Sequence, residues 1–89
     1  MLRLTVLASG PASSLILAEG RLVGEWADLL EGEYRRTRDA AGKVMLDIGA
    51  VTDVDTRGLL VLRRLQQEAV VLRGLSPLML ALLSEETAQ

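Results

Sequence analysis

Residues 43–68 place an apolar strand directly before a helix, and this order limits the folds open to the chain. Residues 43–48 are a nearly continuous apolar run, which is typical of a strand in a parallel sheet covered on both faces. Residues 56–68 then change to helical spacing. The positions predicted to face inward on this helix are Leu59, Leu62, Leu65 and Ala69. A strand followed by a helix in this way predicts an α/β domain.

The first part of the chain supplies two further strands and a helix. Residues 2–7 alternate and predict a strand, and residues 14–19 predict a second, antiparallel strand that ends at Gly20. Residues 24–38 have apolar positions three and four apart, with acidic side chains early and arginines late, as a helix dipole prefers. The strand–helix–strand order across 14–48 fits one right-handed crossover.

The C-terminal part adds a short strand and a short helix. Residues 70–72 predict the strand. The Ser-Pro pair at 76–77 predicts the start of an apolar helix over 78–83, because serine caps helices and proline fits their first position. The order is thus β-β-α-β-α-β-α. We expect one small α/β domain over residues 1–89, with a mixed sheet of about four strands. Its helices are expected mainly on one face, and a polar tail is expected at 84–89.

The composition excludes several functional classes. The 89 residues include no cysteine and no histidine, which excludes a disulfide, a zinc–thiolate site, a cysteine nucleophile and a Ser-His-Asp triad. The net charge of -2 and the presence of only two aromatic residues, Trp26 and Tyr34, argue against a nucleic-acid partner. No apolar stretch approaches the length of a membrane span. We therefore expect a cytoplasmic, non-enzymatic binding domain with no metal and no cofactor.

The segment 46–59 joins the end of the apolar strand to the start of the next helix. It reads Leu-Asp-Ile-Gly-Ala-Val-Thr-Asp-Val-Asp-Thr-Arg-Gly-Leu, and its residues 49–55 are expected to form a loop. Helix N-termini carry free backbone N–H groups and partial positive charge, so they suit anions. Asp55 or Thr56 can cap this helix, and Gly58 lets another backbone come close. From the spacing alone, a plain structural cap is the commoner interpretation.

The pattern Leu-Asp-Ile-x-x-Val-x-x-Val-Asp-Thr-x-Gly-Leu resembles the central motif of the STAS domain family, which includes bacterial anti-sigma factor antagonists. Glu-Gly-Arg-Leu at 19–22 and Leu-Ser-Pro at 75–77 stand where the family has similar elements. The resemblance covers residues 2–84. It implies the small α/β STAS fold and a docking or regulatory role in bacterial transcription regulation, carried out through a protein partner.

The motif departs from the family at the position that carries its switch. Family members with switch function read Asp-Ser-Ser-Gly, and a partner kinase phosphorylates the second serine. The matching residues here are Asp55, Thr56, Arg57 and Gly58, and Arg57 cannot accept phosphate in that way. The resemblance thus implies a partner-binding loop, made of these four residues and Asp53, without the usual serine switch. Thr56 is the alternative phosphosite, and Arg57 either meets an acidic partner or points into water.

Two protein partners are open at this point. The first is a kinase-type anti-sigma factor. The second is the ATPase of a bacterial lipid-trafficking ABC transporter, because the Asp-Thr-x-Gly-Leu form also resembles the small STAS subunit that supports such ATPases. An enzyme acting through Asp47, Asp53 and Asp55 is the weakest alternative, since the chain has no paired acid and base and the spacing is not that of an EF-hand.

Two apolar features also have alternatives. The last helix, 78–83, has almost no polar face, so it is either buried against the sheet or exposed as a patch that marks a partner. A homodimer formed through this helix is one such alternative. Trp26 is either an anchor of the core or, if exposed, an interface hot spot.

Overall fold

The computed structural model describes residues 1–68 and 70–85 of the chain. The order of elements is the predicted β-β-α-β-α-β-α. The predicted polar tail 84–89 begins too early, because residues 84 and 85 belong to the last helix. Its other four residues and the predicted inward position Ala69 lie outside the described residues. The elements are β1 (Leu2–Gly10), β2 (Ser13–Leu22), α1 (Glu25–Ala41), β3 (Lys43–Val54), α2 (Thr56–Gln67), β4 (Val71–Arg73) and α3 (Pro77–Glu85).

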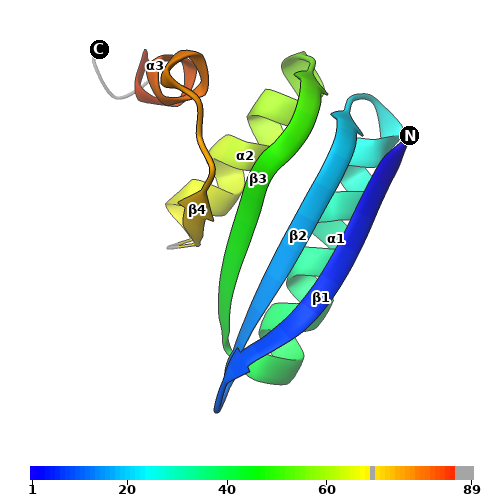
Figure 1. Ribbon diagram of the computed structural model, residues 1–89, viewed down its shortest axis with the longest axis vertical. Coiled ribbons are helices and arrows are strands. Elements are labelled where there is room, and N and C mark those ends of the chain that lie inside the picture. The colour runs from blue at the N-terminus through cyan, green and yellow to red at the C-terminus, as the bar shows by residue number, and fades with distance from the viewer. Residues whose placement is uncertain (69, 86–89) are drawn as a thin grey trace.

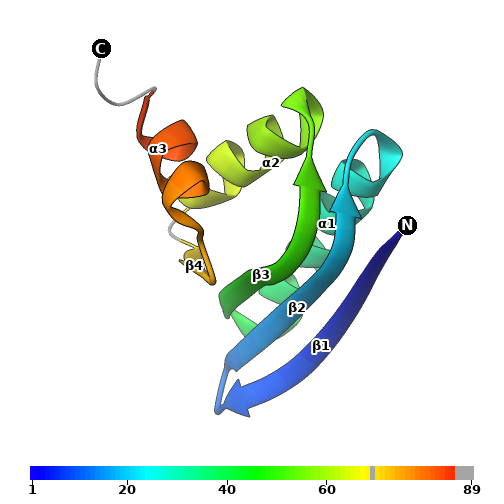
Figure 2. The ribbon, with the colours of Figure 1, turned by 45° about the horizontal axis from the view of Figure 1, so that its top comes forward.

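The strands form one mixed sheet in the order β1-β2-β3-β4 (Figure 1). β1 pairs with β2 in antiparallel orientation, whereas β2 with β3 and β3 with β4 are parallel. Helices α1 and α2 cover one face of the sheet, and α3 lies beside α2 near the end of β3 (Figure 2). The predicted mixed sheet of four strands, with its helices gathered mainly on one face, is confirmed.

The core lies between the sheet and the two long helices. Val44, Leu46 and Ile48 of β3 are buried toward the helices, while Met45 and Asp47 between them are only half-buried. The prediction that this strand is covered on both faces is therefore wrong. Because α1 and α2 both lie on the same side of the sheet, the face of β3 that carries Met45 and Asp47 has no long helix over it.

Three strands extend further than the sequence indicates, and one of them is β1, which runs to Gly10 and does not end at residue 7. β3 continues through residues 49–54, so the predicted loop is wrong, because the parallel ladder with β2 persists to Leu22 opposite Val54. β2 in turn does not end at Gly20. This glycine has a φ of 108°, and a Cβ there would lie 2.3 Å from the carbonyl oxygen of Met1, so it bends the strand without stopping it. A rigid strand consequently leads directly into α2.

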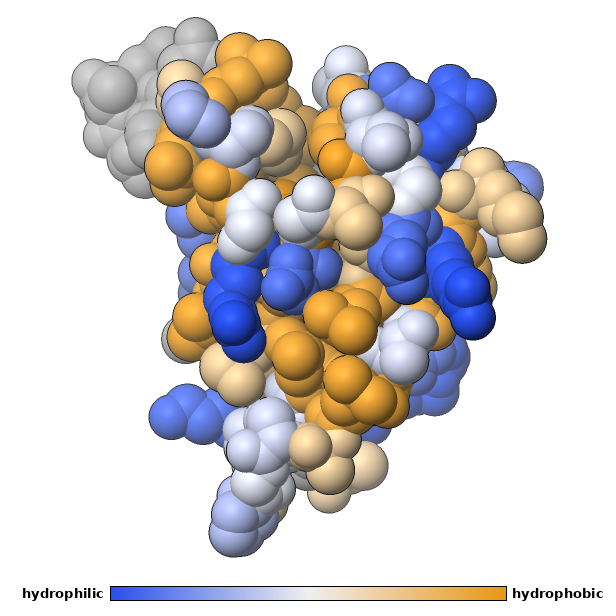
Figure 3. All heavy atoms as spheres, viewed as in Figure 1, coloured by the Kyte–Doolittle hydropathy of each residue, from blue (hydrophilic) through white to orange (hydrophobic). Residues whose placement is uncertain are grey.

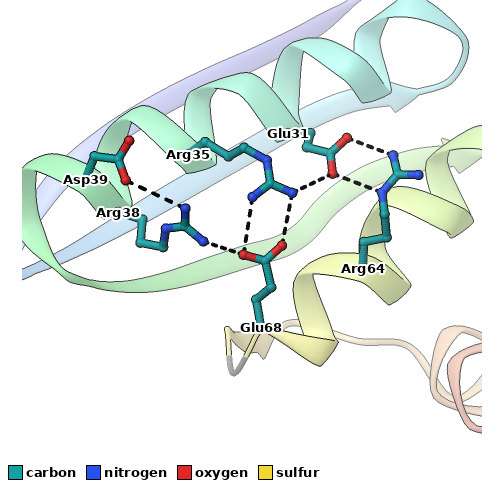
Figure 4. Close-up of polar contacts among 6 residues, drawn as sticks. All are labelled: Glu31, Arg35, Arg38, Asp39, Arg64 and Glu68. Atoms are coloured by element: carbon teal, nitrogen blue, oxygen red, sulfur yellow. Dashed lines mark hydrogen bonds and ion pairs between the residues drawn. The ribbon is translucent and has the colours of Figure 1, made fainter.

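An ion-pair network joins α1 to α2 (Figure 4). The carboxylate of Glu31 accepts from Arg64 at 2.7 Å and from Arg35 at 3.2 Å. Glu68 accepts from Arg35 at 3.0 Å and also from Arg38. Each glutamate thus binds two arginines, and the network runs along the seam between the helices. It fixes the middle and the C-terminal parts of the two helices side by side.

Candidate functional site

Asp55 is the residue between β3 and α2, and its carboxylate holds the starts of two helices together. One oxygen accepts from the backbone N–H of Gly58 at 2.8 Å, which caps α2, and the other accepts from the N–H of Gly24 at 2.9 Å, just before α1. These two backbone donors lower the pKa of the Asp55 carboxyl below its usual value, the Gly58 bond being the larger cause. The sequence predicts the cap but not the link to α1.

Gly58 allows a close approach, and the backbone that approaches belongs to the chain itself. A Cβ at this position would lie 2.2 Å from the carbonyl oxygen of Leu22 and 3.0 Å from a methyl group of Val54. The residue is buried. Gly58 therefore lets α2 pack against the end of β2. It is itself buried and does not form part of the exposed surface.

Arg57 is engaged in a way that the sequence does not indicate. Its guanidinium forms an ion pair with Asp28 in the first turn of α1. Both side chains are about half exposed, at 55% and 47%, so the pair stands on the surface beside the start of α2. Arg57 thus neither points freely into water nor lies idle. It gives α1 and α2 a second connection next to the one made by Asp55.

The three aspartates weighed as a carboxylate cluster have separate partners. Asp47 accepts from the backbone N–H of Gly49 at 2.8 Å, and Asp53 pairs with Arg21 of β2 at 3.1 Å. Asp55 holds the two helix starts as described above. Within residues 1–68 and 70–85, acidic side chains nowhere gather in a group of three that could hold a metal ion.

A hollow of about 370 Å³ lies between α3 and the junction of β3 with α2 (Figure 3, upper part). Hydroxyl groups and one carboxylate stand among apolar side chains in its wall. The residues that line it are Val51, Thr52, Val54, Asp55, Thr56, Leu59, Ser76, Leu78, Met79 and Leu82. The sequence motif covers the β3–α2 side of this hollow. For the α3 side of the hollow, the sequence predicts only an apolar helix that begins at the Ser-Pro pair.

Helix α3 begins as predicted, with Ser76 capping it. The serine hydroxyl accepts from the N–H of Met79 at 3.1 Å, and Pro77 is the first residue of the helix. The alternatives for its apolar surface are both realised in part: Leu83 is buried, whereas Leu78 and Leu80 are 68% and 50% exposed. The exposed Leu78 lines the hollow together with residues of the β3–α2 junction.

Thr56 is the first residue of α2, exposed to solvent and part of the wall of the hollow. Its hydroxyl stands at a helix N-terminus, where backbone N–H groups lack intrahelical partners. Trp26, in the first turn of α1, is 38% exposed. Asp53, Thr56 and Arg57 are thus exposed at the junction of β3 with α2, and Thr56 shares the wall of the hollow with apolar side chains of α3.

No family model matches the chain, and no curated protein matches it in sequence. Solved structures do match. The unphosphorylated anti-sigma factor antagonist SpoIIAA matches with a TM-score of 0.65 at 15% identity, over 86% of this chain and 77% of that one. The crystal structure of Mglu matches with a TM-score of 0.61 at 21% identity, over 82% of this chain and 19% of Mglu.

These likenesses establish the fold. The chain has the STAS fold of SpoIIAA, a small α/β domain with a four-stranded mixed sheet and three helices, and the prediction made from the motif is confirmed. Relative to Mglu the chain spans about a fifth of the length. Among the described helices, none combines the length and the apolar character that crossing a membrane requires.

Proposed function

We propose that the chain is a non-enzymatic docking domain of the anti-sigma factor antagonist kind, which binds a protein partner through the start of α2. The observation that carries the proposal is the double anchoring of this surface. Asp55 and Arg57 each tie the start of α2 to the start of α1, so exposed residues are presented in a fixed geometry directly after a strand. Rigid presentation lowers the ordering cost of binding.

In this proposal the surface binds its partner without a phosphorylatable serine at residue 57. Arg57 stands where switch proteins of the resembled family have their phosphoacceptor, and it pairs with Asp28. Its half-exposed guanidinium can exchange Asp28 for a carboxylate of the partner. Thr56 is the remaining hydroxyl at this helix start. A phosphate there adds a charge of about -1.5 to -2 to the docking surface, which would pair with Arg57 and so regulate docking.

The partner of this proposal is a kinase-type anti-sigma factor, which places the chain in bacterial transcription regulation in the cytoplasm. One observation favours a second candidate. The absence of a hydroxyl at residue 57 suits a STAS subunit that supports the ATPase of a lipid-trafficking ABC transporter, where docking is constitutive. Both candidates use the same surface and differ in the protein that binds it.

The proposal is tested by capture of partners from bacterial lysate with Arg57→Glu, followed by affinity measurement with the purified partner. The matched control is Arg36→Glu, because Arg36 forms an exposed ion pair with Glu33 within α1 at 2.8 Å, away from the loop. We expect Arg57→Glu to weaken binding at least tenfold and Arg36→Glu to leave it unchanged. Equal effects of the two variants would contradict the proposal.

A charge exchange separates partner contact from the internal pair. The double variant Asp28→Arg with Arg57→Glu restores an ion pair between the helices but presents the opposite charge at residue 57. We expect it to unfold like the wild type and still bind weakly. Wild-type binding by this variant would show that Arg57 acts only within the chain.

Thr56→Glu, which imitates a phosphate, is expected to weaken capture of a kinase-type partner.

A further inference from the structure

β1 is a long edge strand whose outer side has no neighbour among the described strands. It runs for nine residues, Leu2–Gly10, and lies at the end of the sheet beside β2 (Figure 1). The opposite edge is β4, which has only three residues. A long edge presents a row of backbone donors and acceptors that another strand can pair with.

The register shows which backbone groups of β1 face outward. The carbonyl oxygen of Met1 accepts from the N–H of Arg21 at 2.9 Å, and the antiparallel ladder then places Arg3 opposite Glu19. Hydrogen-bonding direction alternates along a strand, so odd-numbered residues of β1 direct their N–H and C=O groups to β2. The groups of Leu4 and Val6 therefore point away from the sheet.

The side chains of β1 are mostly apolar or small, and few of them would oppose pairing with another strand. Val6 and Leu7 are 43% and 46% exposed, one on each face. Arg3 is the single charged residue of β1, whereas guarded edges usually carry more charges or a proline. Beside Val6 a hollow of about 300 Å³ opens against the C-terminal half of α1. Its other lining residues are Ser14, Glu33, Arg36, Thr37 and Ala40.

We propose that a second copy of this chain occupies the edge, with the two β1 strands paired antiparallel about a two-fold axis near Thr5. In this register Leu4 lies opposite Val6 of the second copy, and their outward backbone groups bond. Arg3 lies opposite Leu7, where its apolar stem covers the exposed leucine. No like charges face each other, in contrast to a register centred on Arg3.

The sequence and the direction of β1 favour a second copy of the chain as the partner of this edge. An antiparallel strand is its own complement, and a two-fold contact closes after two copies. The apolar side chains of the second β1 that share the face of Val6 also cover the hollow beside α1, which β1 alone leaves open. Because the contact is confined to one strand and one hollow, it falls in the small class of interfaces. The dimer is therefore expected to depend on protein concentration.

The test compares two lysine substitutions on opposite edges by sedimentation velocity, at concentrations up to about 1 mM. Val6→Lys places a charge on the outer edge of β1. Val71→Lys is the matched control, because Val71 is 48% exposed on β4. The wild type and Val71→Lys should dimerise, and Val6→Lys should stay monomeric with an unchanged circular dichroism spectrum. A monomeric wild type, or a dimer lost only in Val71→Lys, would overturn the proposal.

Amide hydrogen exchange of the wild type gives an independent readout that needs no variant. The amides of Arg3 and Thr5 are bonded to β2 and should be protected at every concentration. Those of Leu4 and Val6 should gain protection only as the dimer forms. A dimer in which these two amides remain as fast as in the monomer would place the contact elsewhere and refute the β1 pairing.

Discussion

At the scale of single residues, Gly58 shows how the proposed docking surface depends on a buried contact beneath it. The carbonyl oxygen of Leu22 lies 2.2 Å from the place of a Cβ at this residue, and Val54 closes the other side at 3.0 Å. The start of α2 can therefore rest on the ends of β2 and β3 only if residue 58 has no side chain. Packing alone therefore accounts for a glycine at this position of the motif.

We predict that Gly58→Ala destabilises the protein by about 1–3 kcal/mol, because the methyl group forces backbone atoms apart. Gly32→Ala is the matched control. It lies within α1, where the nearest atom to a new Cβ is the end of the Arg36 side chain at 3.8 Å, so alanine should stabilise the helix by up to about 1 kcal/mol. Urea unfolding measures both. A stability change of the same sign in the two variants would contradict the packing argument.

Arg57 marks the limit of what the motif can predict. The sequence identifies the exposed position at the helix start, and it leaves open whether the side chain meets water or a partner. The structure gives it a third environment, an ion pair with Asp28. The two residues are 29 positions apart, and their contact depends on the packing of α1 beside α2. Local sequence rules contain no information on such a contact.

At the scale of elements, ion pairs across the seam between α1 and α2 hold the two helices side by side. Glu31 contacts Arg64 and Arg35 across this seam, and the hydrogen bond and charge of Arg64 lower its carboxyl pKa despite the opposing effect of burial. A carboxylate with a lowered pKa stabilises the folded state above its ordinary pKa. This contribution is lost as the pH falls through the lowered value.

We predict that Glu31→Gln lowers the free energy of unfolding at neutral pH and reduces its decline between neutral pH and about pH 3, where carboxylates titrate. Glu33→Gln serves as the control, because Glu33 pairs only locally with Arg36 on α1. Urea unfolding across the pH range measures both variants and the wild type. The account of the seam fails if Glu31→Gln and the wild type lose stability in parallel as the pH falls.

The element boundaries show where sequence reasoning succeeds and where it does not. Both ends of α1 and α2 are predicted to within a few residues, because charge placement and the Asp55 cap act locally. The C-terminal half of β3 was mistaken for a loop. Its Gly, Thr and Asp residues suit a loop, and only the ladder with β2, which is a tertiary contact, keeps this segment extended.

At the scale of the whole molecule, the sequence predicts the order of elements and the mixed sheet. It predicts only some of the residues that form the candidate site. Asp53, Thr56 and Arg57 are exposed at the β3–α2 junction as the motif predicts. The hollow beside them is closed by Leu78, Met79 and Leu82 of α3. These residues are more than 20 positions further along, and only the folded chain brings them to the junction.

The two surfaces proposed here lie on different parts of the molecule and can be tested separately. The docking surface combines the start of α2 with the hollow next to α3, whereas the pairing edge is β1 at the far side of the sheet (Figure 1). A dimer formed through β1 leaves the docking surface of each copy accessible. Loss of one activity in a variant therefore leaves the other intact.

Docking through the start of α2 is tested by amide hydrogen exchange, measured on the chain alone and on the chain saturated with the partner captured from lysate. The account predicts that protection on binding is concentrated at residues 56–60 and 76–82, the start of α2 and the facing part of α3. The outer faces of α1 and β1 should exchange at unchanged rates. Protection confined to β1 or to the Glu68 end of the helix seam, with none at the start of α2, would contradict it.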